Sequence, residues 1–249
     1  MIRSLLLLLS LTFFFQSYAQ TILIDPGHGG EDCGAKKYLK GSTNKKQKVC
    51  EKDLALQISK AIQDQLTGKY RVYLTRSFDR NLSLHQRAEM ADKVKADLFI
   101  SVHANSSRYR TSTGFETYYL SNHKDKAVSK IESVENQDLS GTQVLINKIL
   151  ADLVIERSAP ESKLLAKHIH RGITKKIVKK HKLRNRGIKP AIFYVLVLSK
   201  RPSVLLEPGF ISNQKDYRRL FSKEFQIEYA QGVREGVDAY FKALKKKKF

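Results

Sequence analysis

The sequence predicts an α/β domain with a mainly parallel, twisted sheet, helices on both of its faces, and one inserted helical segment. Two observations lead to this fold class. Short apolar runs alternate along the chain with longer segments in which apolar residues recur every three or four positions. Parallel strands need helix-length crossovers, so this alternation is typical of a parallel sheet covered by helices. Because no internal repeat and no Pro- or Ser-rich linker interrupts the pattern, we expect one globular domain.

The first half of the chain carries the clearest patterns. Residues 21–24 are an apolar run that leads into Asp-Pro-Gly, which indicates a strand followed by a loop. Within 51–66 the apolar residues Leu54, Ile58 and Ile62 lie four positions apart, as on one face of an amphipathic helix. The next expected elements are a strand at 70–75, a helix at 84–94, a buried strand at 98–102 and a strand at 114–120.

Residues 121–160 interrupt this alternation. They are polar at first and then rich in Val, Leu and Ile from Val144 to Ile155, so we expect a helical insert between a strand and a helix. The elements expected after it are a helix at 161–181, strands at 191–196 and 203–207, and helices at 216–221 and 225–244.

Composition and charge limit the class of protein. The chain has 249 residues, 41% of them hydrophobic, and a formal net charge of +22. These values exclude collagen, a low-complexity polymer and a wholly disordered chain, and the length is enough for a hydrophobic core. Such a high positive net charge indicates what kinds of partner the protein could bind, but it gives no information about the fold.

The N-terminus is typical of a secretory signal peptide. A basic start at Arg3, an apolar run from Leu5 to Phe15 and small residues at Ser17 and Ala19 indicate cleavage after residue 19. An uncleaved membrane anchor is the alternative. We therefore expect an exported protein of the periplasm or cell envelope, without stable membrane insertion, whose single catalytic domain spans residues 20–249.

Four residues with metal-binding or acid–base chemistry stand at predicted strand ends or at a helix start. They are His28, Glu51, His103 and Glu207. In parallel α/β sheets, ligands gather at the carboxyl ends of the strands. Two His and one Glu form a known catalytic zinc ligand set that leaves a position for water or substrate, and a second Glu can accept the proton of that water. Each residue singly also has a structural explanation, because a His in a Gly-rich turn is usually exposed and the helix dipole favours a Glu at a helix start.

Six sequence blocks in this order closely resemble the zinc-dependent N-acetylmuramoyl-L-alanine amidases, which trim bacterial peptidoglycan. The blocks are IDPGHGG at 24–30, EKDLAL at 51–56, TRSFD at 75–79, Leu84 with Arg87-Ala88, ADLFISVHAN at 96–105 and VLLEPGFISN at 204–213. The resemblance covers about residues 21–243. It implies that His28, Glu51 and His103 bind zinc and that Glu207 is the catalytic carboxylate.

The implied reaction is hydrolysis of the amide between N-acetylmuramic acid and the L-alanine of the stem peptide, in cell-wall remodelling or daughter-cell separation. Asn105 is a candidate for orienting a ligand or the substrate, and a structural turn is its alternative role. The alternative function is a catalytically inactive, basic wall-binding module. A third possibility is a zinc peptidase that cuts within the stem peptide.

Two cysteines flank the expected zinc loop. Export would place Cys33 and Cys50 in an oxidising compartment, where a disulfide and two separate thiols are both reasonable. If His28 and Glu51 share one zinc, the loop between them must fold back and bring both cysteines near it. Our hypothesis is then a disulfide that clamps this loop.

The insert at 121–160 also has a counterpart in the family. It resembles the helical insert of a cell-separation branch, in which a Glu blocks the zinc until an activator with a LytM domain displaces the helix. Glu135 is the best match for that autoinhibitory ligand, and Glu132, one turn earlier, is the second choice. An ordinary surface subdomain whose glutamates face water is the alternative.

Basic residues are concentrated between Arg171 and Lys189, where no acidic residue occurs, and at Lys245–Lys248. Export argues against nucleic acid as a partner, because the anions available there are stem-peptide carboxylates and anionic envelope polymers. Peptidoglycan is the partner that the family resemblance implies. A solvated face without a specific partner is the default interpretation of these lysines.

Overall fold

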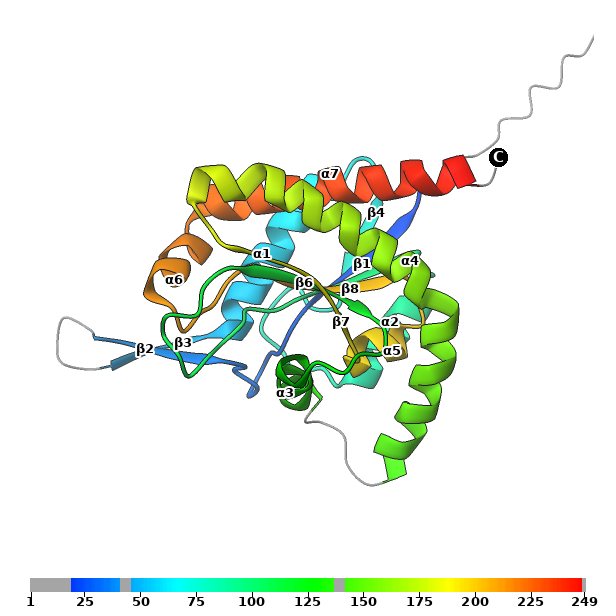
Figure 1. Cartoon of the computed structure of the whole chain (residues 1–249), viewed down its shortest axis with the longest axis horizontal. Helices are drawn as coiled ribbons and strands as arrows, with labels where there is room; N and C mark the ends of the chain where they lie inside the picture. The colour runs from blue at the N-terminus through cyan, green and yellow to red at the C-terminus, as the bar shows by residue number, and fades with distance from the viewer. Residues whose placement is uncertain (1–18, 41–45, 137–141, 248–249) are drawn as a thin grey trace, which may run out of the picture.

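The computed structural model describes residues 19–40, 46–136 and 142–247 (Figure 1). Nearly all of the predicted signal peptide therefore lies outside the described residues. The strands are β1 (Thr21–Pro26), β2 (Lys36–Lys40), β3 (Lys46–Cys50), β4 (Arg71–Leu74), β5 (Leu98–Val102), β6 (Phe115–Leu120), β7 (Asn185–Ala191) and β8 (Ser203–Glu207). The helices are α1 (Glu51–Leu66), α2 (Leu84–Lys93), α3 (Lys126–Glu135), α4 (Thr142–His181), α5 (Tyr194–Ser199), α6 (Gln214–Leu220) and α7 (Lys223–Lys247). Among these helices, none is long and apolar enough to cross a membrane.

One six-stranded sheet organises the molecule, with the strands in the order β4-β1-β5-β8-β6-β7. All neighbouring pairs are parallel except β6 and β8, which are antiparallel. The central strands β1, β5 and β8 are buried along their whole length, which explains why their sequences are nearly continuous apolar runs. The predicted class, a mainly parallel α/β sheet, is confirmed.

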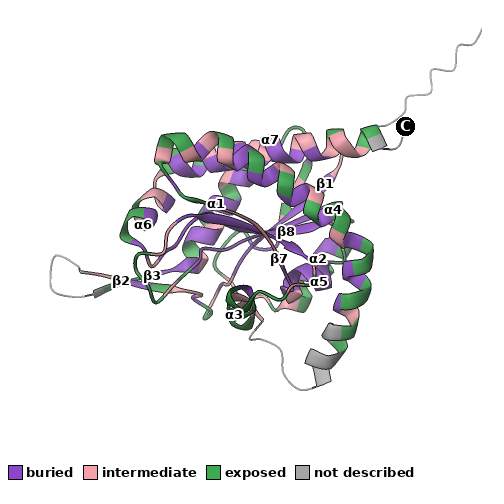
Figure 2. Ribbon diagram, in the orientation of Figure 1, coloured by how far each residue is buried: buried purple, intermediate pink, exposed green. Residues whose placement is uncertain are grey.

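Helices cover both faces of this sheet (Figures 1 and 2). On one face, α1, α7 and the second half of α4 enclose the larger apolar core. On the other face, α2 and α5 pack on the sheet together with the first half of α4. The buried apolar residues of α1, α2 and α5 thus belong to the cores on the two faces of the sheet, whereas α4 and α7 also pack against each other.

The segment 121–160 contains α3 and the first part of α4, and α4 continues without interruption through Pro160 to His181. The division that we expected at residue 160 therefore falls inside one helix. Apolar residues of α4 change partners along its length. Ala151 and Ile155 belong to one core, whereas Leu165 and Ile169 belong to the other.

Two local expectations differ from the structure. The strand predicted at 191–196 is wrong, because β7 ends at Ala191 and Tyr194–Ser199 forms the short helix α5. A short apolar run buried in a core does not distinguish strand from helix by its periodicity. β7 itself contains Pro190, which a strand tolerates at the edge of a sheet. The β2–β3 hairpin was not predicted.

Candidate metal centre

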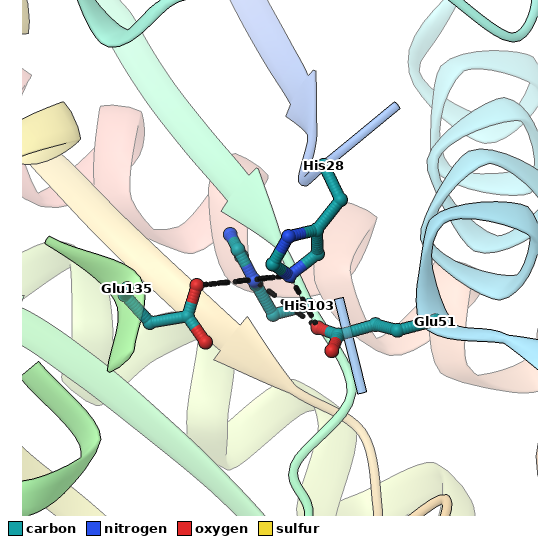
Figure 3. Close-up of side chains that lie close together, drawn as sticks. All are labelled: His28, Glu51, His103 and Glu135. Atoms are coloured by element: carbon teal, nitrogen blue, oxygen red, sulfur yellow. Dashed lines mark hydrogen bonds and ion pairs between the residues drawn. The ribbon is translucent and has the colours of Figure 1, made fainter. Parts of the chain in front are cut away.

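Three neighbouring strands deliver the candidate residues to one edge of the sheet. His28 follows β1, His103 follows β5 and Glu207 ends β8. The registers pair Pro26 with Val102 and Val102 with Leu206, so the three strand ends are level. His28, His103 and Glu51, the first residue of α1, point toward one another (Figure 3).

Glu51 is held in place by the backbone. Its Oε1 accepts a hydrogen bond from the N–H of Ala104, and its Oε2 accepts one from the N–H of Ala35, both at 2.8 Å. The disulfide between Cys33 and Cys50 joins the loop after β1 to the residue before Glu51. The loop that carries His28 and the helix that begins with Glu51 are thereby tied together covalently.

The two imidazoles are also oriented. The Nδ1 of His28 lies 2.7 Å from Asp32 Oδ2, which leaves its Nε2 facing the cluster. The His103 ring lies against Gly27, where a Cβ would come within 2.5 Å of the ring. At Gly34, with φ +61°, a Cβ would come within 2.5 Å of the His28 ring. Only glycine leaves room for both rings at these positions.

The donor atoms have the spacing of ligands around one small cation. His28 Nε2 and His103 Nδ1 are 3.1 Å apart, and each lies 3.2 Å from Glu51 Oε1. Four ligands placed about 2.0–2.1 Å from one ion in a tetrahedron would lie about 3.3 Å from one another. The residues therefore fit a tetrahedral divalent metal.

Glu135 completes this set from α3. Its Oε2 lies 3.1 Å from His103 Nδ1 and 3.7 Å from His28 Nε2 (Figure 3). Donor atoms of His28, Glu51, His103 and Glu135 all lie within 4.8 Å of one another. Glu135 thus occupies the place where a fourth ligand, such as water or substrate, would stand.

The charges of the cluster favour a cation. Burial opposes charging of the His28 imidazole, but the Glu51 and Asp32 carboxylates outweigh it and raise the pKa of His28 to about 10. Burial also opposes charging of His103, whose pKa Glu135 and Glu51 raise to about 10. The carboxylates of Glu51, Asp32 and Glu135 therefore stabilise positive charge at this cluster.

Glu207 differs from the other acids. It is 1% exposed, and its Oε2 has no hydrogen-bond partner in the described part of the chain. Burial raises the pKa of Glu207 well above its usual range, and the carboxylates of Glu51 and Glu135 add to this effect. A buried carboxyl group with a high pKa is suited to proton transfer near neutral pH.

The helix α3 is fixed mainly by polar contacts. Val128 is its only fully buried residue. Glu132 accepts a hydrogen bond from the N–H of Ile192 and is not one of the four residues of the metal cluster. Asn136 donates to the carbonyl of Ile192 at 3.0 Å and accepts from the N–H of Tyr194 at 2.9 Å. We call Glu132 and Asn136 the α3 latch, because they attach α3 to the 192–194 segment.

Asn105 contacts a residue that the sequence did not suggest. Its Nδ2 donates to Glu116 at 3.2 Å, and within the described structure Asn105 forms no hydrogen bond with the candidate ligands. Glu116, together with Arg186 and Lys189, lines a cavity of about 660 Å³ that also reaches His28, Glu135 and Glu207. Glu116 stands in a strand and Arg186 in a charged segment, and neither has a local pattern that marks it as functional.

The chain was compared with known proteins. The Amidase_3 family model, described as N-acetylmuramoyl-L-alanine amidase, matches residues 22–239. The amidase AmiC of Escherichia coli O6:H1 is 33% identical over 88% of this chain and 52% of the relative. AmiA of Escherichia coli K12 is 33% identical over 89% of this chain and 76% of the relative. The chain therefore spans about half the length of the first relative and about three quarters of the second.

Solved structures of N-acetylmuramoyl-L-alanine amidases also resemble this chain. A crystal structure of N-acetylmuramoyl-L-alanine amidase from Clostridium difficile 630 superposes with a TM-score of 0.65 at 30% identity, covering 91% of this chain and 98% of that one. AmiC2 of Nostoc punctiforme gives a TM-score of 0.63 at 29% identity, covering 90% and 97%. The CwlD amidase of Clostridioides difficile, solved in complex with the GerS lipoprotein, gives 0.65 at 26% identity, covering 90% and 99%.

Proposed function

The chain belongs to the N-acetylmuramoyl-L-alanine amidase family, and on this premise we propose that it is a zinc-dependent peptidoglycan hydrolase. The bond cleaved is the amide between the lactyl group of N-acetylmuramic acid and the L-alanine of the stem peptide. One observation carries the proposal. His28, Glu51 and His103 present donor atoms 3.1–3.2 Å apart, with the buried Glu207 in the same cavity.

Zinc is the metal that this ligand set favours. Two imidazoles and one carboxylate bind catalytic zinc in other hydrolases, with one position open. When bound, zinc would polarise the scissile carbonyl and increase the acidity of water. His28, Glu51 and His103 would hold the ion, and Asp32 and the two backbone N–H groups on Glu51 would keep these ligands in position.

Glu207 would carry the proton. As the oxygen of water bonds to the lactyl carbonyl carbon, the unpartnered Oε2 of Glu207 accepts the proton of that water. The same carboxyl group then gives the proton to the alanine nitrogen as the C–N bond breaks. Its burial keeps bulk water away and holds its pKa high enough for both steps.

Glu135 would act as an autoinhibitory ligand. Its carboxylate lies 3.1 Å from His103 Nδ1, in the position that the substrate carbonyl or water must occupy. Since α3 buries only Val128 and depends on the α3 latch, a modest binding energy could displace it.

An activator with a LytM domain would be the partner that releases α3, in the separation of daughter cells. Two large apolar residues on α4 support a docking surface there, because Ile149 is 59% and Leu153 is 63% exposed one turn apart. A partner shifts α3 only by binding the displaced state more tightly than the docked one. The predicted signal peptide supports export to the periplasm or cell envelope, where both peptidoglycan and such a partner would be met.

Digestion of purified peptidoglycan tests the reaction. We expect release of stem peptides with a free L-alanine N-terminus, loss of release with EDTA, and recovery on addition of zinc. Glu207→Gln should lower the rate by at least about a hundredfold, since it removes the proton carrier but keeps the shape. Mass spectrometry of the products identifies the bond. Binding to the wall without release would instead support an inactive wall-binding module, and EDTA-resistant release would contradict the zinc proposal.

A further inference from the structure

The cavity that reaches the metal cluster continues to a group of positive charges. Beyond Glu207 it is lined by Arg186 and Lys189 of β7 and by Glu116 of β6. The side chains of Arg186 and Lys189 are 28% and 25% exposed, and both line this cavity.

Glu116 fixes the place of both cations. It pairs in register with Glu207 across β6 and β8, and side chains of such pairs lie on the same face of a sheet. Glu116 is 1% exposed and forms ion pairs with Arg186 and, at 2.9 Å, with Lys189. Asn105 and Tyr118 also donate to it, so its carboxylate is fully engaged and rigidly held.

One carboxylate does not neutralise two cations. Arg186 and Lys189 have no other acidic partner in the described part of the chain, which leaves a net charge of +1 on this group. Two further cations, Arg108 and Lys130, line the same cavity, and neither forms an ion pair with a described acid. The end of the cavity at Arg186 and Lys189 therefore favours an anionic ligand, whereas the end at Glu51, Glu135 and Glu207 favours a cation.

The geometry of the proposed hydrolysis indicates which part of the substrate would lie near these cations. The group that protonates the departing alanine nitrogen must face the leaving side of the scissile bond, and in our proposed function this group is Glu207. Glu116 neighbours Glu207 on the side away from β1 and β5, the strands that lead to His28 and His103. The peptide would therefore extend past Glu207 toward β7.

We propose that Arg186 and Lys189, positioned by Glu116, form a carboxylate-binding subsite for the peptide part of the substrate. It would take the free α-carboxylate of the residue that follows L-alanine in the stem peptide. The inference rests on the proposed function. Arg186 offers a planar fork and Lys189 a point charge, a combination that holds a carboxylate with charge-assisted hydrogen bonds.

Two substrates test this subsite. Both are N-acetylmuramoyl dipeptides with their other carboxyl groups blocked as amides, and they differ only in a carboxylate or a carboxamide at the α-position of the second residue. Glu135→Ala protein, in which α3 no longer offers a ligand to the cluster, serves as the starting enzyme. We expect it to prefer the carboxylate substrate. Adding Lys189→Met should raise KM for that substrate about tenfold, with little change in kcat and little effect on the carboxamide.

Two variants serve as controls. Lys189→Arg should restore most of the preference, because it returns the charge. Lys176→Met removes the same charge on α4, outside the cavity, and should change neither KM. Equal KM values for the two substrates in the starting enzyme, or an equal effect of Lys189→Met on both, would overturn the subsite.

Direct binding separates this inference from the proposed function. If the starting enzyme hydrolyses neither substrate, the proposed function fails, and calorimetric titration of the same two compounds still decides the subsite. Tighter binding of the carboxylate compound that is lost in Lys189→Met would support it. Equal binding of both compounds would reject it.

Discussion

His28 reaches the candidate metal centre with one ring nitrogen because the other is engaged. Asp32 Oδ2 lies 2.7 Å from its Nδ1, and Asp32 Oδ1 accepts a hydrogen bond from the N–H of Gly34. This carboxylate is therefore fixed by the same turn that carries the imidazole. A carboxylate behind a metal-binding imidazole orients the ring and increases its basicity.

A prediction at the residue scale concerns this pair. Asp32→Ala should weaken zinc binding about 10- to 100-fold, because His28 loses the group that orients it. Competition with a chromophoric chelator measures the affinity. The neighbouring Glu31 is exposed and forms no ion pair with any described residue, so Glu31→Ala is the matched control and should leave the zinc affinity unchanged. Equal affinities for both variants would show that Asp32 does not position His28.

At the scale of elements, α3 joins two opposing properties. It carries Glu135 to the centre, yet it buries little apolar surface and depends on Glu132 and Asn136 for its attachment. Apolar burial stabilises a docked helix in proportion to the area removed from water, and here that area is small. The attachment therefore rests on a few polar contacts and little apolar burial, as the proposed autoinhibition requires.

The α3 latch gives the corresponding prediction. Glu135→Ala should raise basal peptidoglycan hydrolysis because it removes the competing ligand, and Asn136→Ala should do so because it frees the helix. Only Asn136→Ala should also speed amide hydrogen exchange in 126–135. Lys124→Ala, an exposed change just before α3, is the control for both readouts. Unchanged hydrolysis in both variants would exclude autoinhibition by α3.

The link between β1 and α2 is a second element-scale feature. Asp25 on β1 is 1% exposed and forms an ion pair with Arg87 of α2 at 2.8 Å. Burial would raise the pKa of Asp25, but Arg87 and the Thr75 hydroxyl outweigh it and hold the pKa below its usual value of 3.8. Arg87 also donates to the carbonyls of Pro26 and His28, so this pair shapes the loop that carries His28.

The acid dependence of stability follows from that pair. A carboxyl group whose pKa is lower in the folded state stabilises the fold above its unfolded pKa, and this contribution is lost as pH falls through the folded pKa. Asp25→Asn should lower the free energy of unfolding at pH 7 by about 3–5 kcal/mol, because it leaves Arg87 buried without its partner. Urea titrations should also show a smaller loss of stability below pH 4 in the variant. Parallel pH curves for both proteins would contradict the role of Asp25.

For the whole molecule, the decisive feature is that distant segments meet at one edge of one sheet. β1, β5 and β8 are neighbours in space although their residues lie far apart in the chain. The disulfide Cys33–Cys50 closes the loop between the first strand and α1, with a sequence separation of 17. It limits the positions of His28 and Glu51 relative to each other already in the unfolded chain.

The disulfide provides the prediction at this scale. Loss of the bond in Cys33→Ser with Cys50→Ser should lower the free energy of unfolding by about 3 kcal/mol, because the unfolded chain regains loop entropy. Denaturant titration measures the change. Protein purified from an oxidising compartment should resist alkylation until it is reduced, as mass spectrometry will show. Two free thiols in that protein would contradict the clamp.

Most of the fold could be predicted from local patterns. Leu98–Val102 and Ser203–Glu207 were predicted with their observed bounds, and so was α1, because each element has an apolar pattern within its own residues. The strand at 191–196 failed for the opposite reason, since its apolar run fits a buried strand and a buried helix equally well. The β2–β3 hairpin has a lysine-rich sequence in which no such pattern exists.

The sequence by itself determined the fold class and the family, because periodicity and the six blocks are properties of the linear chain. It also named His28, Glu51, His103 and Glu207 as candidates by residue type and by their places at element ends. Only the tertiary structure decided that three of these bring donor atoms within 3.2 Å of one another and that Glu135 joins them. The order of the strands and the crossovers between them set those distances. Both depend on how the whole chain packs. For the same reason neither segment by itself predicts that Glu116 pairs with Arg186 and Lys189, which lie some 70 residues away in the chain.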